Sequence, residues 1–345
     1  MPLRVAALQF FATPFDLARN LETVERLARA AAGQGAQIVV VPELFNTGYV
    51  YAPRLSALAE TDDGPTLRHL VRLSAELKIH LAGPLLLREA GRIFNVFALV
   101  TAEGKIHKYR KRHPFLWEHC YFEAGREPLI AETAWGRIGL MTCWDIAYRD
   151  VSEAYRGRVD LLLHASAPPR FHRAVLNFPL GKKIYLAQLM PELLRDREAI
   201  DDWYLGAVAA RARWIGAPIV HAVMAGRFVT EVPFPRLSFL AAALGRPRYW
   251  PLVSRANLAS LRATFYGASA IFSAQGDTLA HVEGEEGLAL ADVTPNNNSA
   301  LPASPLDTDN SRYLLPKIPA RLRAMEWAMQ WLGSKYYRRR NWADK

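Results

Sequence analysis

The chain has 345 residues, of which 51% are hydrophobic, enough for a large core in one big domain or two ordinary ones. Two cysteines over this length exclude a disulfide framework and fit a reducing, intracellular setting. The net charge of +10 permits contact with nucleic acid or an anionic membrane, but the basic residues are scattered except near residues 335–340. The charge therefore indicates solubility and one basic tail rather than a nucleic-acid partner.

Signals for export or membrane insertion are not expected in this chain. Residues 1–4 lead directly into a strand-like alternating run, with no charged region ahead of an apolar stretch, so no signal peptide is predicted. No run of 18 apolar residues is free of charge, so no membrane-spanning helix is predicted. Together these features predict a cytoplasmic protein.

In chain order, the hydrophobic pattern alternates predicted strands with predicted helices. Residues 5–10 form an expected strand, and Asp16 caps a helix whose apolar stripe ends before Gly33. Because hairpins are interspersed among the strand–helix alternations, we predict two packed sheets with helices outside. Further strands are expected at residues 38–41, 79–87, 94–100, 105–109, 137–142, 159–164, 219–224, 267–273, 278–282 and 287–292, and further helices at 65–78, 148–156, 203–214 and 318–332.

Two segments do not fit this compact plan and are predicted to be long insertions. Residues 171–202 are rich in basic and apolar residues around two prolines, and residues 227–262 carry four prolines. A linker-like Pro-Asn-Asn-Asn stretch at 295–298 begins a tail. We therefore expect one domain over residues 1–294 and a C-terminal extension over 295–345 that packs on a partner subunit.

Cys143 stands where a short apolar strand, residues 138–141, gives way to a turn and a helix. Such an elbow suits a nucleophile, because free backbone N–H groups beside it can receive the oxyanion that forms when a thiolate attacks a carbonyl. Free cysteine is also among the most buried residue types, so this stretch fits a structural cysteine equally well. The other segments must decide between the two interpretations.

Glu43 and Lys111 also follow predicted strands, and reacting groups collect at the carboxyl ends of strands in open sheets. These residue types suit hydrolysis of a carbon–nitrogen bond, because a thiol with a pKa of about 8.5 needs activation. Glu43 is a candidate base for the thiol and later for water, and Lys111, with the backbone N–H of Trp144, is a candidate for holding the oxyanion. Taken alone, Glu43 also fits an exposed loop acid, and Lys111 also fits a solvated basic face.

Three motifs in this order resemble those of the nitrilase superfamily, the carbon–nitrogen hydrolases. Residues 39–49 (VVVPELFNTGY) resemble the family's Glu motif, 109–115 (YRKRHPF) its Lys motif and 139–145 (GLMTCWD) its Cys motif. A fourth segment, 117–125 (WEHCYFEAG), is similar to the loop that carries the family's second, substrate-orienting Glu. The resemblance covers roughly residues 3–293 and is interrupted by the two insertions.

The resemblance implies an α/β fold of the four-layer α-β-β-α sandwich type, and dimerisation that extends the sandwich. It also implies cofactor-free hydrolysis through a covalent thioester. By position, it implies that Cys143 is the nucleophile, Glu43 the general base, Lys111 the oxyanion support and Glu118 an orienting second acid. Pro114 departs from the aliphatic residue that the family commonly has at this place, so the loop beyond Lys111 is expected to differ while Lys111 stays in place.

The bond to be cleaved is predicted from one position. Asp145 follows Trp144 where nitrile-cleaving members of the family typically carry Glu, which favours a small-molecule amide or N-carbamoyl substrate over a nitrile. Acyl transfer to an amine, and a non-enzymatic binding protein on an old hydrolase scaffold, are the alternatives from other classes. Tyr49, His113, Trp117 and Trp144 are candidates for lining a partly aromatic pocket, although each also fits ordinary loop packing.

Other nucleophile and metal arrangements are less well supported. Cys120 lies beside His119 in a loop, but no strand-end elbow precedes it, so packing is the better interpretation. A papain-like pair would need His164 or His221 near the nucleophile, and both look like core histidines that follow apolar strands. The loose cluster of His113, His119 and Cys120 lacks the paired spacing of zinc ligands, so no metal site is expected.

The apolar stretch 237–244 is flanked by arginine and aromatic residues, a pattern that can lie on a membrane interface. The same stretch can form a lid over the site or a contact between subunits. We favour these two interpretations over peripheral membrane contact. A homodimer or a higher homo-oligomer is therefore expected.

Overall fold

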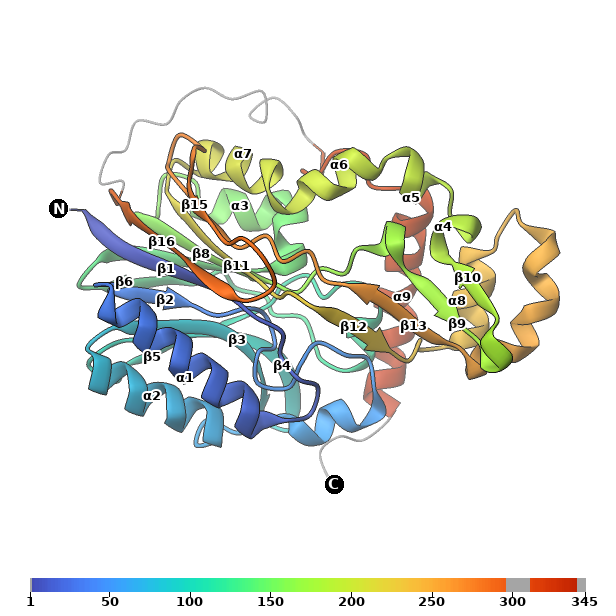
Figure 1. Ribbon diagram of the computed structural model, residues 1–345, viewed down its shortest axis with the longest axis horizontal. Helices are drawn as coiled ribbons and strands as arrows, with labels where there is room; N and C mark the ends of the chain where they lie inside the picture. Colours follow the sequence, from blue (N-terminus) through green and yellow to red (C-terminus); the bar gives the residue numbers. More distant parts are fainter. Residues whose placement is uncertain (1, 296–310, 340–345) are drawn as a thin grey trace.

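The computed structural model of the chain describes residues 2–295 and 311–339 (Figure 1). Residues 296–298 of the predicted linker at 295–298, and the last arginine of the predicted basic tail, Arg340, lie outside the described residues.

The first sheet contains six strands, of which β1, β2 and β3 run parallel and the others pair antiparallel. The parallel strands are short apolar runs that are buried along almost their whole length, as expected for strands covered on both faces. In spatial order the strands are β16 (Gly287–Val293), β1 (Leu3–Gln9), β2 (Ile38–Val40), β3 (His80–Glu89), β4 (Arg92–Val100) and β5 (Ile106–Arg110).

Helices α1 (Leu17–Gly33) and α2 (Pro65–Leu77) connect the parallel strands of this sheet and cover its outer face (Figure 1). The predicted cap is confirmed, because the Asp16 side chain accepts a hydrogen bond from the backbone N–H of Arg19 at 3.1 Å. Pro65 occupies the first turn of α2, where its missing N–H costs no helical hydrogen bond.

The second sheet also contains six strands, and β7, β8 and β11 run parallel at its centre. Helices α3 (Arg149–Tyr155) and α7 (Gly206–Ile215) cover its outer face (Figure 1). In spatial order the strands are β15 (Thr278–His281), β14 (Ala270–Phe272), β11 (Ile219–Val223), β8 (Leu161–Ser166), β7 (Gly136–Thr142) and β6 (Ile130–Thr133).

The two sheets pack face to face, and the layer between them is apolar. Alternate side chains of each strand point into this layer, as strand geometry requires. Figure 1 shows the resulting succession of helices, sheet, sheet and helices, which confirms the predicted α-β-β-α sandwich. The layer includes Val5 and Ala7 of β1, Ile38 and Val40 of β2, Leu161 and Leu163 of β8, and Val220 and Ala222 of β11.

The two predicted insertions are not independent loops, because they pair with each other. Leu176 of the first is in register with Leu261 of the second, within a four-stranded antiparallel sheet. This sheet and the short helices around it form a lobe at one end of the sandwich (Figure 1). Its strands are β10 (Lys183–Tyr185), β9 (Val175–Asn177), β13 (Ser260–Thr264) and β12 (Arg227–Thr230), and its helices are α4 (Leu186–Leu189), α5 (Glu192–Arg195), α6 (Arg197–Asp201) and α8 (Pro235–Ala242).

The C-terminal helix α9 (Ala320–Arg339) packs on its own chain, against the 3-10 turn Leu116–Cys120. The approach is close at Gly333, where an added Cβ would meet the Cβ of His119 at 2.8 Å. The hydroxyl of Tyr337 accepts a hydrogen bond from the backbone N–H of Ile93 at 2.7 Å. Packing of this extension on a partner subunit stays a prediction. Within the described ranges, no helix is long and apolar enough to cross a membrane.

Candidate active site

The central side chains of the candidate site lie just beyond the carboxyl ends of three strands. Glu43 lies just beyond β2, Lys111 directly follows β5, and Cys143 directly follows β7. All three side chains are buried, as is Glu118 in the turn that follows β5. The two sheets thus bring together groups that are far apart in the sequence.

The ammonium group of Lys111 lies between two carboxylates. Its Nζ is 2.8 Å from Oε1 of Glu43, and 3.0 Å and 2.7 Å from Oε1 and Oε2 of Glu118. None of the three side chains is more than 1% exposed. Because water does not screen these charges, they attract one another more strongly than surface charges do, and because burial has removed their hydration, each member depends on the others to stay charged.

Backbone and side-chain donors fix both carboxylates. Glu43 accepts hydrogen bonds from the Asn95 side chain at 2.8 Å and from the backbone N–H of Ala167 at 3.1 Å. Glu118 accepts hydrogen bonds from the Tyr49 hydroxyl and, at 2.7 Å, from the backbone N–H of Phe115. Every carboxylate oxygen therefore has at least one donor, which holds the two acids in place.

Electrostatics keep the resting thiol protonated. Burial raises the pKa of Cys143 well above its usual value, the charge of Glu43 raises it further, and the charge of Lys111 partly offsets both. Burial also raises the pKa of Glu118 to about 7, against the opposing effect of Lys111. Burial alone would lower the pKa of Lys111, but the two carboxylates raise it well above its usual value, so this side chain stays cationic. A thiol in this setting needs a base at the moment it attacks.

The backbone at the site is held in an uncommon conformation. Cys143 has φ of +46°, and Leu44 and Leu116, beside the two acids, have φ of +51° and +44°. Left-handed conformations of this kind cost of the order of 1–3 kcal/mol each in a residue other than glycine and need support from their surroundings. Asp145 supplies it at the elbow, because its carboxylate accepts hydrogen bonds from the backbone N–H of Thr142 and the hydroxyl of Tyr109.

A cavity of about 30 Å³ opens beside Cys143. Tyr49 and Trp144, both candidates from the sequence, line it together with Cys143 and Tyr204. The other residues that line it are Phe115, Ala167, Pro168, Pro169, Phe171, Leu193, Ile200, Trp203, Tyr266 and Leu322. The cavity is therefore mostly aromatic and apolar.

Two predicted pocket residues lie elsewhere. Trp117 lines a neighbouring cavity and donates its indole N–H to the hydroxyl of Ser238 at 3.0 Å. The His113 ring stacks on Tyr148, with centroids 3.5 Å apart, and its Nε2 lies 3.0 Å from Asp150. His113 is not among the residues that line the Cys143 cavity. A direct role for these two side chains at the thiol stays a prediction, and their placement does not favour it.

The histidines near the nucleophile belong to the core. The Nε2 atom of His164 lies 3.3 Å from the backbone oxygen of Cys143, and the ring stacks on His221 with centroids 4.3 Å apart. Burial lowers the pKa of His164 to about 3, so this ring is neutral and unsuited to a papain-like ion pair. Across residues 2–295 and 311–339, no group of three or more His, Cys, Asp or Glu side chains is arranged to hold a metal ion.

Several site residues were not predicted. Asn95 and Ala167 hold Glu43, and Leu322 of α9 reaches the cavity. Glu326, also on α9, accepts hydrogen bonds from the Trp144 indole and, at 2.7 Å, from the Tyr148 hydroxyl. Ala167 follows the predicted strand at 159–164, so its place at a strand end was a usable signal. Nothing local in the sequence marks Glu326.

Comparisons with known proteins agree on the type of protein. The model of the carbon-nitrogen hydrolase family matches residues 4–302. A chloroplastic omega-amidase of Arabidopsis thaliana is 28% identical over 233 residues, which are 62% of this chain and 59% of that protein. An N-carbamoylputrescine amidase of Solanum lycopersicum is 31% identical over 160 residues, which are 44% of this chain and 53% of that protein. The chain thus spans between half and three fifths of these two relatives.

A solved structure gives the same picture for the fold. It is a mutant of the amidase from Nesterenkonia sp. AN1 that shows the result of Michael addition of acrylamide at the active-site cysteine. Its TM-score is 0.60 at 20% identity, and the match covers 84% of this chain and 92% of that one. A likeness at this identity supports the fold alone.

Proposed function

The chain belongs to the carbon–nitrogen hydrolase family, and from that premise we propose that it hydrolyses a non-peptide amide or N-carbamoyl bond through a thioester on Cys143. The observation that carries the proposal is the buried Lys111 ammonium held between Glu43 and Glu118 beside this thiol. The amidases among the curated relatives support the same reaction.

The first half-reaction forms the thioester. Glu43 takes the thiol proton as the Cys143 sulfur attacks the carbonyl carbon, and the electron pair of the carbonyl moves onto its oxygen. Lys111 and the backbone N–H of Trp144 stabilise this oxyanion. The pKa of Cys143 is raised by burial, so the thiol depends on Glu43 to take its proton.

The thioester then forms and is cleared. As the oxyanion collapses to a carbonyl, the carbon–nitrogen bond breaks and Glu43 returns its proton to the departing nitrogen. A water molecule next gives a proton to Glu43 and attacks the thioester carbon. Collapse of that second intermediate breaks the carbon–sulfur bond, and Glu43 returns its proton to the departing sulfur of Cys143. Glu118 keeps Lys111 in place throughout, through contacts of 2.7–3.0 Å.

Asp145 bears on the choice of substrate less directly than its position in the sequence suggested. Its carboxylate accepts hydrogen bonds from Tyr109, Thr142 and the backbone N–H of His113, so it shapes the turn and does not line the Cys143 cavity. Nitrilases stand beside amidases among the relatives, so a preference for an amide over a nitrile needs a direct test. Acyl transfer to an amine is a further outcome that the same test detects.

The test is an activity screen over small amides, N-carbamoyl amines and nitriles, with and without an added amine acceptor. We expect release of ammonia or amine from the first two classes, and loss of turnover in Cys143→Ala without unfolding. Cys120→Ala is the matched control, because Cys120 is also a buried free cysteine, and it should retain activity. Turnover by Cys143→Ala at the wild-type rate would refute the proposed mechanism.

The proposed setting is a cytoplasmic homodimer or higher homo-oligomer. Both cysteines are free, which fits a reducing compartment. Leu237 and Leu240 on α8 and Leu244 just beyond it are between 39% and 60% exposed, and burial of such a patch fits contact between subunits. Light scattering at micromolar concentration should give at least twice the chain mass. A monomer that co-sediments with anionic vesicles at low salt would favour membrane contact instead.

A further inference from the structure

A second cavity adjoins the first, and its chemistry identifies one end of the substrate. We propose that the acyl part of the substrate is an unbranched aliphatic chain of roughly six to nine carbons, which extends from Cys143 into this apolar cavity. The inference rests on the proposed hydrolase function and names its substrate class.

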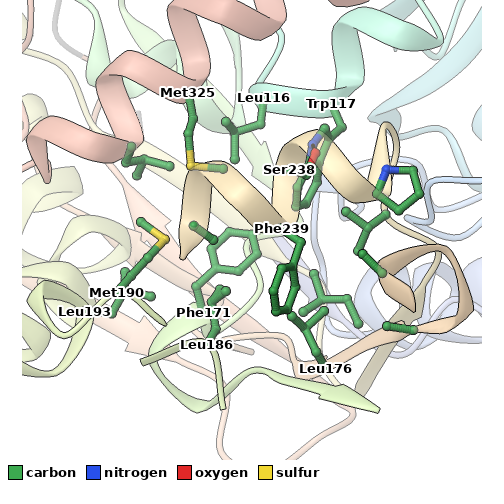
Figure 2. A pocket seen from close by; sticks show the side chains of 17 residues that line it. Leu116, Trp117, Phe171, Leu176, Leu186, Met190, Leu193, Ser238, Phe239 and Met325 are labelled. Carbon is green, nitrogen blue, oxygen red and sulfur yellow. Dashed lines mark hydrogen bonds between the residues drawn. The ribbon is translucent and has the colours of Figure 1, made fainter. Parts of the chain in front are cut away.

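Apolar side chains make up almost all of the lining of the second cavity (Figure 2). Among the described side chains that line it, only Ser238 and Trp117 carry a nitrogen or oxygen atom. These two satisfy each other, because the Trp117 indole donates to the Ser238 hydroxyl at 3.0 Å, and that hydroxyl donates to the backbone oxygen of Pro233 at 2.7 Å. No polar side-chain group is therefore left to hold water or a polar ligand, and a cavity of this kind stays dry or binds an apolar group.

The two cavities are separated by no more than one layer of side chains. Phe171, Leu193 and Leu322 line both of them. Figure 2 shows Leu193 and Leu176 on opposite sides of the apolar cavity, so its lining reaches from the shared wall into the small sheet of the lobe. Movement of the shared side chains would join the cavities into one channel that begins at the Cys143 thiol.

Apart from Leu116 and Trp117 in the turn after β5, the apolar cavity is built from the two insertions and helix α9. The first insertion supplies Leu176 and Leu193, the second supplies Phe239 and Ala242, and helix α9 supplies Leu322. These three segments together line one apolar space next to the nucleophile. Because three side chains line both this cavity and the Cys143 cavity, we interpret it as part of the substrate site and not as a packing void.

The volumes of the two cavities give the proposed length of the acyl chain. The apolar cavity measures about 60 Å³ and the Cys143 cavity about 30 Å³. A group the size of water, which is close to that of a methylene, needs about 10–15 Å³ on this measure. The apolar cavity therefore holds roughly four to six such groups and the Cys143 cavity roughly two to three, which gives the proposed six to nine carbons.

A ladder of straight-chain primary amides tests the proposal. We expect kcat/KM to rise by about fourfold per added methylene from acetamide towards octanamide, because each buried methylene adds a fixed increment of apolar transfer free energy. The rise should stop at about nine carbons, where the two cavities are full. A value of kcat/KM that stays level or falls from acetamide to octanamide would overturn the proposal.

A matched pair of variants on α8 tests where the acyl chain of the substrate binds. Ala242 lines the cavity and is 4% exposed, whereas Ala241 lies on the same helix outside the lining. Ala242→Phe should lower the ratio of kcat/KM for octanamide to that for acetamide by at least about tenfold. Ala241→Phe should leave this ratio within about twofold of wild type. Ala256→Leu, a milder filling of the same cavity, should act like Ala242→Phe if the latter unfolds. Equal effects of the Ala241 and Ala242 substitutions would contradict the proposal.

A binding measurement separates this inference from the proposed function. In the Cys143→Ala variant, octanamide should raise Tm and acetamide at the same concentration should not, and adding Ala242→Phe should remove the shift. A shift by octanamide without turnover of any amide or N-carbamoyl amine by wild type would leave the chain site standing and refute the hydrolase function. Turnover of acetamide without that shift would refute the chain site and leave the function standing.

Discussion

Replacing Lys111 with methionine should reveal how far the site depends on one buried cation. The substitution keeps most of the apolar stem but leaves Glu43 and Glu118, both less than 2% exposed, without their shared partner. Removing one member of a buried ion pair costs about 3–5 kcal/mol, which is a large share of the 5–15 kcal/mol that holds a typical protein folded. We therefore expect a loss of this size from the free energy of unfolding at pH 8.

The loss should depend on pH with a defined sign. Burial already raises the pKa of Glu118 from 4.5 to about 7, and without the cation this carboxyl is still more easily neutralised. A carboxyl whose pKa is higher in the folded than in the unfolded state stabilises the fold at low pH, and this stability is lost as pH rises. The destabilisation of Lys111→Met should therefore be smallest near pH 5 and should grow through pH 7 towards pH 8.

Urea unfolding followed by tryptophan fluorescence at pH 5 and pH 8 measures both effects. Lys108→Met is the control, because Lys108 lies on the adjoining strand and also pairs with two carboxylates, at 2.8 Å and 2.7 Å, but is 30% exposed. It should lose no more than about 1 kcal/mol at either pH. Equal losses for the two lysines, or a loss for Lys111→Met that does not grow with pH, would refute the reasoning.

Three further predictions concern residues around the site. In initial-rate assays, the kcat/KM of the wild type should rise with pH through about 7 as the Glu118 carboxyl ionises. Glu118→Gln should abolish this rise and lower kcat/KM by about 10²-fold. An unchanged pH profile in this variant would contradict the role of this acid. Glu326→Ala leaves the Trp144 indole and the Tyr148 hydroxyl without an acceptor, so chemical unfolding should show a free energy of unfolding lower by about 1–3 kcal/mol per donor. Gln330→Ala, at an exposed position of the same helix, should leave the free energy of unfolding almost unchanged. Gly333→Ala should lower Tm because the new Cβ meets backbone and side-chain atoms at 2.8–3.3 Å. Gly33→Ala is the control, because its new Cβ has nothing within 4 Å, and it should leave Tm unchanged or raise it. A higher Tm for both variants would mean that α9 does not pack this closely.

The catalytic candidates could be predicted because strand ends are marked locally. Glu43 follows a short apolar run closed by proline, and Lys111 and Cys143 directly follow strands with clear hydrophobic patterns. The strand and helix patterns were enough to predict two packed sheets with helices outside, and the resemblance to the family implied the four-layer sandwich. The order of the strands within each sheet depends on pairings between distant segments, and the sequence pattern does not encode them directly.

The insertions were harder to interpret because their elements are short and pair over long distances. Strand β9 has three residues, and its partner β13 lies more than eighty positions away. A run of three residues shows no periodicity, so only tertiary pairing makes it a strand. The contribution of α9 was missed for a similar reason: the helix itself was predicted, but the burial of Glu326 beneath Trp144 depends on where the helix docks.

The most direct test of the central claim is to observe the acyl group on the enzyme. Wild-type protein quenched in acid during turnover of an amide should carry an added acyl mass, and peptide mapping should place it on Cys143 and not on Cys120. The adduct should be absent from Cys143→Ala treated in the same way. Amide turnover with no adduct on Cys143, or with the acyl group on another residue, would contradict a thioester mechanism at this site.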